Sequence, residues 1–166
     1  DWSSDVCSSD LAAGIPFEVV PGVTTAVAVP ELAGIPVTHR GIASGFLVLA
    51  GHTAELVDDA LRSVKPHSLS VVFLMAIGAR SELAARLVAH GWAGETPAAI
   101  VCNGSTASCW TWTGRLDGMG AANVPAGAAG VLVIGEVVRV RETLQRLSAP
   151  ASASVAADLE VRLKEG

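Results

Sequence analysis

Apolar positions along the chain occur in two kinds of pattern, one typical of strands and one typical of helices. The points where one pattern gives way to the other mark the ends of the predicted elements. Short runs rich in valine, isoleucine and leucine indicate strands, whereas apolar residues three and four positions apart indicate helices. We expect strands at 17–20, 46–50, 69–75, 98–102, 110–113 and 131–134, and helices at 26–33, 54–64, 80–90 and from after Gly135 to about Leu147. Strands that alternate with helices in this way predict an α/β fold, with a mixed sheet of about five strands flanked by helices.

Turn and capping residues mark where several of these elements begin and end. Thr53 is placed to cap the helix at 54–64, and Gly91 stands where a C-terminal glycine belongs. Pro30 lies inside the helix at 26–33 and is expected to bend it or to lie near its end. Residues 118–130 are small and without a period, so they predict a loop that can hold a short helical turn. The apolar face of the helix at 80–90 consists of Leu83, Leu87 and, more weakly, Ala84 and Val88.

The chain contains one notable corner at 20–26, where Val-Pro-Gly-Val-Thr-Thr-Ala follows the first predicted strand. Proline ends the strand because it has no N–H to donate, and glycine permits the turn. Thr24 and Thr25 then stand at the position of an N-cap. Corners of this kind, at the carboxyl edge of a sheet, often bind nucleotides and related ligands. The residues alone fit an ordinary βα connection equally well.

Composition and charge narrow the classes of function. An apolar fraction of 51% with 16% charged residues, in a chain of 166, is typical of a folded domain with a sizeable core. The formal net charge of −5 argues against general nucleic-acid binding, which usually needs a basic face. No stretch reaches the roughly 18 apolar residues of a membrane span. The polar, acidic start at 1–5 does not form a secretory signal.

The cysteines and histidines predict no metal centre. Cys7, Cys102 and Cys109 fit no zinc spacing, and the four histidines are scattered singly. Cys102 lies in an apolar strand pattern, which favours a small buried hydrophobic residue. This use of cysteine is typical of a reducing, cytoplasmic compartment. The sequence indicates no Ser-His-Asp triad either.

A resemblance to a known family begins at residues 17–40, FEVVPGVTTAVAVPELAGIPVTHR. This stretch resembles the uroporphyrinogen-III C-methyltransferases of the tetrapyrrole methylase family, in which VVPG-[VI]-T precedes a small-residue helix and then GIP-[LV]-THR. The THR element points to this subgroup, because related methylases usually lack it. The resemblance extends over about residues 12–147 and implies a tetrapyrrole methylase-like α/β fold.

The resemblance implies S-adenosylmethionine as the cofactor, held by several separated segments. Met75 in VVFLMAIG matches the methionine of the family's YMG, with Ala76 in place of the glycine, and Gly104 in AIVCNGST matches an NGT loop. Judged singly, a methionine that ends an apolar strand is usually a core residue, and an Asn-Gly pair is usually a turn. Their joint occurrence at the family's spacing favours cofactor binding. The cofactor positions that we carry over are Thr24, Thr25, Met75, Ala76, Ala98 and Gly104.

The resemblance also implies a porphyrinogen substrate rich in carboxylates, which calls for basic contacts. His39 and Arg40 are the first candidates and His52 the second, although an exposed His-Arg pair taken alone is more often a solvated loop. Trp110 and Trp112 are expected to cover the sheet or an interface, because no basic surface accompanies them. No catalytic side chain is expected. The sulfonium is already a strong electrophile, so the protein mainly aligns the reactants and excludes water.

The domain organisation follows from the same comparison of motifs. We expect 12–36 to be the end of a first methylase domain, 37–147 to be the second domain, and 148–166 to be a linker and a tail helix. Residues 1–11, DWSSDVCSSDL, resemble translated adapter read-through and are interpreted as a non-native leader or a polar tail. The family's GxGPGD and GGD loops do not occur in this sequence. It therefore looks like the carboxyl-terminal part of a truncated enzyme, and we expect the chain to be inactive alone.

By resemblance, the intact enzyme would be a homodimer that methylates uroporphyrinogen III to precorrin-2, on the route to sirohaem and cobalamin. Two alternatives stay open. A methylase of a later corrin intermediate would share the fold, although the THR element argues against it. A non-catalytic α/β binding or dimerisation module would need no upstream half.

Overall fold

The computed structural model describes residues 9, 12–16 and 18–148, so the predicted tail helix and nearly all of the predicted leader lie outside the described residues. From residue 25 onward the predicted helices and strands are confirmed, with ends that differ by at most two residues. In chain order the elements are α2 (Thr25–Leu32), β1 (Phe46–Ala50), α3 (Ala54–Arg62), β2 (Ser70–Leu74), α4 (Arg80–Ala89), β3 (Pro97–Cys102), β4 (Trp110–Arg115), the 3-10 helix η1 (Leu116–Ala121), β5 (Gly130–Ile134) and α5 (Val138–Ser148).

The strands form one mixed sheet of five strands in the order β1-β2-β5-β3-β4. β1 and β2 are parallel, whereas β5 lies antiparallel between β2 and β3, and β4 lies antiparallel at the outer side of β3. As a result, the carboxyl ends of β1, β2 and β3 meet at the edge of the sheet where β5 begins. That edge is where ligands commonly bind in open α/β sheets.

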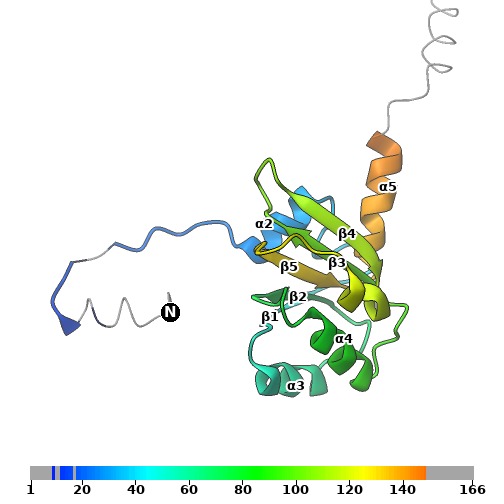
Figure 1. Ribbon diagram of the computed structural model, residues 1–166, viewed down its shortest axis with the longest axis horizontal. Helices are drawn as coiled ribbons and strands as arrows, with labels where there is room; N and C mark the ends of the chain where they lie inside the picture. Colours follow the sequence, from blue (N-terminus) through cyan, green and yellow to red (C-terminus); the bar gives the residue numbers. More distant parts are fainter. Residues whose placement is uncertain (1–8, 10–11, 17, 149–166) are drawn as a thin grey trace, which may run out of the picture.

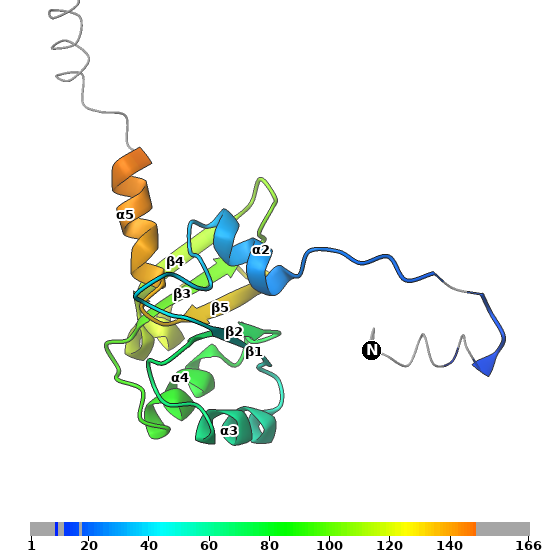
Figure 2. The same ribbon diagram turned by 180° about the vertical axis from the view of Figure 1, so that it is seen from behind.

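Helices cover both faces of this sheet (Figures 1 and 2). α3, α4 and η1 pack on one face, over an apolar cluster that includes Phe73, Ile100 and Leu132. α2 and the start of α5 pack on the other face, over Val72 and Val133. The three central strands are thus buried on both sides, which explains why they are almost continuously apolar in sequence.

The strand expected at 17–20 is wrong for the residues that the structure describes there. Residues 18–20 assume no strand, and Val19 and Val20 are 75% and 78% exposed. A strand needs a neighbour with which its N–H and C=O groups can pair, and the described residues place none beside this segment. Instead, residues 18–23 run away from the body of the fold as an extended arm that leads into α2 (Figure 1).

Two of the expected helix signals behave differently from the prediction. Thr53 occupies the N-cap position of α3, yet its side chain makes no capping hydrogen bond. Val88 on α4 is 46% exposed, because it borders an open groove beside η1 instead of facing the core. The other signals are confirmed: Thr24 caps α2, and Gly91 follows α4 with a φ of +89°, which favours glycine.

The segment at 34–36, which ends the expected first domain, packs into the same apolar cluster as the sheet. Ile35 is fully buried and Val37 is 6% exposed. Arg141 on α5 also donates a hydrogen bond to the carbonyl of Ala33, directly after α2. A cation at the carboxyl end of a helix interacts favourably with the negative end of the helix dipole and so stabilises the helix. Helix α2 is therefore fixed on the sheet by burial on one side and by α5 on the other.

We predict that Ile35→Ala lowers the free energy of unfolding by about 2–5 kcal/mol, because it leaves a cavity in the cluster beneath α2. Leu32→Ala is the matched control, since Leu32 is only three positions away but 65% exposed. Its effect should stay within about 0.5 kcal/mol. Urea unfolding followed by circular dichroism measures both, and equal effects of the two substitutions would contradict this packing of the segment.

Candidate functional site

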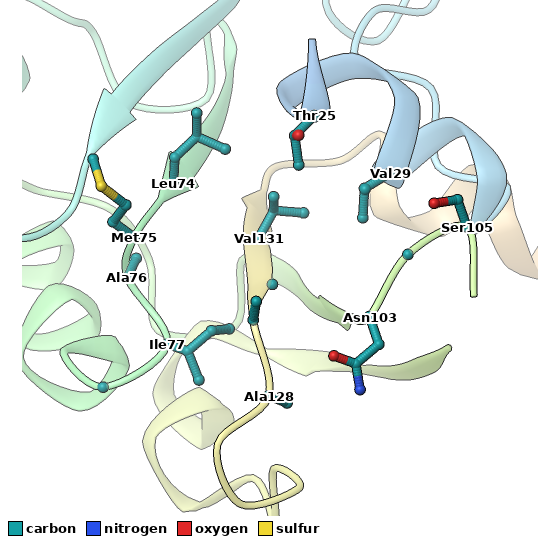
Figure 3. A pocket seen from close by; sticks show the side chains of 14 residues that line it. Thr25, Val29, Leu74, Met75, Ala76, Ile77, Asn103, Ser105, Ala128 and Val131 are labelled. Carbon is teal, nitrogen blue, oxygen red and sulfur yellow. The ribbon is translucent and has the colours of Figure 1, made fainter. Parts of the chain in front are cut away.

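A cavity of about 630 Å³ lies at the edge of the sheet where β2 and β3 end and β5 begins (Figure 3). This volume falls within the roughly 300–1,000 Å³ that is usual for small-molecule sites. None of its lining residues carries a charged side chain. They are Thr25 and Val29 from α2, Leu74, Met75, Ala76, Ile77 and Gly78 at and after the end of β2, Asn103, Gly104 and Ser105 after β3, and Ala128, Ala129, Gly130 and Val131 around the start of β5.

The structure brings Thr25, Met75, Ala76 and Gly104 together at this cavity. Thr24 does not line it, because its hydroxyl caps α2 by accepting a hydrogen bond from the Ala26 N–H at 3.3 Å. The four cofactor positions that do line the cavity come from three separate segments of the sequence. The resemblance to the family implied that these separated segments lie together.

Ala98, the remaining predicted cofactor residue, is not brought to the cavity. It is fully buried near the amino end of β3, where it pairs with Gly114 and Ile134. Since a strand advances about 3.3 Å per residue, most of the length of β3 separates Ala98 from Gly104. Ala98 is therefore packed inside the sheet and does not line the cavity.

The backbone of the cavity wall is strained at several points. Met75, Asn103 and Ser105 have φ values of +53°, +51° and +63°, and they account for three of the four non-glycine residues with positive φ in the described part of the chain. Side chains other than asparagine or aspartate cost on the order of 1–2 kcal/mol in this conformation. Met75 is also 66% exposed, so it is not the core residue that its apolar strand would favour.

Two close contacts hold the walls of the cavity together. A methyl group on Gly104 would lie 2.5 Å from Cγ2 of Val29, so glycine is what lets the loop after β3 touch α2. A methyl group on Gly51 would lie 2.6 Å from Cβ of Ala76. Ala76, which stands where the family usually has glycine, is therefore accommodated by a glycine at the end of the neighbouring strand.

Sequence reasoning missed the part of the wall at 128–131, as well as Val29. The loop at 118–130 was recognised as small and flexible, but its sequence does not show that β5 inserts between β2 and β3. Only that strand order places residues 128–131 beside Met75 and Gly104. Val29 carried a signal, since it lies one helical turn after Thr25 and thus on the same side of α2.

The predicted substrate contacts lie outside the cavity. His39 and Arg40 are exposed in a turn that is closed by pairing of His39 with Ala43, and the His39 ring interacts with the Arg40 carbonyl through Nδ1 at 2.9 Å. His52 is exposed directly after β1. Because β1 and β2 are parallel and Ala50 pairs with the residue before Met75, His52 lies at the same edge of the sheet as the cavity.

The described residues contain no group of three or more histidine, cysteine or acidic side chains that could hold a metal ion. Over that same part of the chain, no helix combines the length and the apolarity needed to cross a bilayer. Cys102 is fully buried, and burial raises the pKa of its thiol. It is therefore held as a neutral thiol, in agreement with its interpretation as a small hydrophobic residue.

We predict that Gly104→Ala lowers the free energy of unfolding by about 1–3 kcal/mol, because the added methyl overlaps with Val29. Val29→Ala in the same chain should recover most of this loss. Gly78→Ala serves as the control, since Gly78 lines the same cavity but has no atom within 4 Å of the added methyl group. Urea unfolding of these three variants measures the effects, and a double variant no more stable than Gly104→Ala would contradict the contact.

Comparison with known proteins places this geometry in a family. Residues 5–119 match the Tetrapyrrole (Corrin/Porphyrin) Methylases. The uroporphyrinogen-III C-methyltransferase of Methanocaldococcus jannaschii is 41% identical over 135 residues, which cover 78% of this chain and 55% of that protein. A siroheme synthase of Pseudomonas aeruginosa is 36% identical over 139 residues, which cover 81% of this chain and 30% of that protein.

A solved structure agrees with these similarities. The uroporphyrin-III C-methyl transferase from Thermus thermophilus, complexed with S-adenyl homocysteine, superimposes with a TM-score of 0.67 at 30% identity, over 82% of this chain and 60% of that one. The chain thus spans at most 60% of the length of these three proteins. Motifs, fold and sequence similarity agree, and the chain belongs to the tetrapyrrole methylase family.

Proposed function

We propose that this chain forms one wall of the S-adenosylmethionine site of a uroporphyrinogen-III C-methyltransferase. The observation that carries the proposal is the convergence of Thr25, Met75 and Gly104 on one uncharged cavity. The identity of 41% to the M. jannaschii uroporphyrinogen-III C-methyltransferase supports this subgroup over methylases of later corrin intermediates. The complex of the Thermus protein with S-adenyl homocysteine supports the choice of ligand.

The residues of the cavity fit such a ligand. The small residues at 128–130, together with Gly104, leave room for a flat ring system, and Met75, whose thioether is polarizable, also lines the cavity. Because no charged side chain lines the cavity, a positively charged sulfonium bound there meets no repulsion from a cationic lining residue. When bound, the cofactor supplies an electrophilic methyl group. The residues of this chain then orient the cofactor and keep water away from the reacting atoms.

The basic residues outside the cavity suit the other reactant. A porphyrinogen presents several carboxylates, and charge-assisted hydrogen bonds to arginine or protonated histidine are among the strongest contacts for such groups. We assign this role to Arg40, His39 and His52, all exposed in the structure. The products would be precorrin-2 and S-adenosylhomocysteine, which is the step that leads to sirohaem and cobalamin.

The opposite wall of the site has to come from elsewhere. The arm at 18–23 leaves the body next to Thr25, at the rim of the cavity, and Val19, Val20 and Val23 are at least 75% exposed. We propose that the portion of the relatives that this chain does not match covers these side chains and closes the cavity. A homodimeric, cytoplasmic enzyme is the assembly that the family resemblance favours.

We predict that S-adenosylhomocysteine binds the 166-residue chain, and that Ala129→Phe abolishes this binding without lowering the melting temperature. Ala129 is exposed in the cavity wall, so a phenyl ring there fills the ligand's space but leaves the core intact. Ala126→Phe is the control, because Ala126 is exposed in the same loop but does not line the cavity. Ligand-observed NMR measures the binding. Equal binding by both variants would exclude this cavity as the site.

We predict that the chain alone forms no precorrin-2 from uroporphyrinogen III and S-adenosylmethionine, and that fusion to the unmatched amino-terminal part of the M. jannaschii relative restores activity. In the fusion, Arg40→Gln should raise the KM for uroporphyrinogen III by about tenfold, through loss of a charge-assisted contact, and leave the KM for the cofactor unchanged. Arg62→Gln is the control, because Arg62 is an exposed residue of α3 paired with Asp59. Product formation by the unfused chain would overturn the first expectation.

A further inference from the structure

Arg80, the first residue of α4, connects two of the segments that enclose the cavity. Its Nη1 donates to the Ile77 carbonyl at 3.0 Å, and its Nη2 donates to the Ala122 carbonyl at 3.1 Å, 42 residues away in sequence. Ile77 lines the cavity in the loop after β2. Ala122 directly follows η1 and begins the stretch that leads to the cavity residues at 128–131.

The bonds of Arg80 differ from those of most arginines in the described part of the chain. Its side chain donates only to main-chain carbonyls in that part, and its Nε is buried there without a hydrogen-bond partner. A buried unpaired donor costs free energy that an apolar side chain would avoid. The arrangement is therefore not the most stable one for α4 by itself. The arginines that pair with carboxylates instead are Arg62, Arg86, Arg115 and Arg139.

The geometry of the link suits arginine alone. A guanidinium donates in several directions at once from a rigid planar fork, whereas the ammonium of lysine is a compact group on a flexible stem. The first turn of α4 is also fixed against η1, since a methyl group on Gly120 would lie 2.8 Å from the Ser81 hydroxyl. Arg80 thus donates to both carbonyls from a helical turn that packs closely against η1.

The stretch at 123–129 depends on its two ends. At the far end, the Asn103 N–H donates to the Ala129 carbonyl at 2.8 Å, which ties the stretch to the loop after β3. At the near end, Arg80 ties it to the loop after β2. The hydrogen bonds that the described chain shows between these ends are local, from Val124 to Ala122 and from Ala128 to Pro125. Ala122, Val124 and Ala128 also pack against the core, so loss of the Arg80 link would remove the hydrogen bond from this end to the loop after β2 but not its packing.

We propose that Arg80 is a positioning residue that sets the separation between the loop after β2 and the stretch at 123–129. The effect of this separation on cofactor binding rests on the proposed function, whereas the separation itself does not. Arg80 does not line the cavity, so it acts through the carbonyls of Ile77 and Ala122 and not by contact with the ligand. Its test therefore needs one readout without ligand and one with it.

The ligand-free readout is amide hydrogen exchange of the full 166-residue chain, analysed by mass spectrometry. With Arg80→Met and Arg80→Lys, the two amides of 123–129 that donate hydrogen bonds, those of Val124 and Ala128, should exchange about tenfold faster, because a hydrogen bond to a charged group is lost. Exchange in β2 and β5 should not change, and Arg62→Met should match the unsubstituted chain. Unchanged exchange at 123–129, or an increase spread evenly over the sheet, would overturn the proposal. If Arg80→Met does not fold, Arg80→Lys, which keeps the charge and the stem, decides by the same criteria.

The second readout is the affinity for S-adenosylhomocysteine, measured on the same proteins by ligand-observed NMR. Arg80→Met should weaken binding by about tenfold, since a loosened wall no longer pre-organises the site. Equal affinities would overturn the positioning role even if exchange is faster. If the unsubstituted chain binds no ligand while the local increase in exchange is present, the proposed function fails and the structural role of Arg80 stands.

Discussion

The insertion of β5 between β2 and β3 is the constraint on which the rest of the structure depends. β5 runs antiparallel to both neighbours, so its first residues lie beside the last residues of each. The backbones approach closely at Gly130, where a methyl group would lie 2.5 Å from the Val101 carbonyl oxygen. No other residue type permits this contact without a shift of the backbone. Three loops consequently meet at one edge, and the cavity is the space between them.

Helix α2 closes this space from one face of the sheet, and its position follows from the same edge. Val29 rests against Gly104, and Ile35 is buried in the apolar cluster beneath the helix. The positive φ values of Met75 and Asn103 occur where each residue directly follows a strand that is paired on both sides. The strain turns the chain sharply at the end of the strand, which exposes Met75 while the preceding strand residues stay buried.

Most of the fold could be predicted from the sequence because its strands are short apolar runs separated by clear breaks. The failure at 17–20 has a physical cause: the apolar pattern there reports a strand that needs partners, and no pattern shows whether the partners are present. For the site, Met75 and Gly104 could be placed because they match family motifs at, or just after, the ends of predicted strands. The stretch at 128–131 could not, since strand order depends on long-range pairing. The bond from Arg80 to Ala122 likewise has no local signature.

The distribution of charge around the site separates two physical tasks. A sulfonium is a cation that has to be held without repulsion, and every lining residue of the cavity is uncharged. A polycarboxylate needs basic contacts, and the candidates Arg40 and His52 are exposed outside the cavity. Arg80 does not line the cavity, and its hydrogen bonds go to the main-chain carbonyls of Ile77, which lines the cavity, and of Ala122, which does not. In the function proposed here, the positive reactant and the negative one are thus recognised by different parts of the same sheet edge.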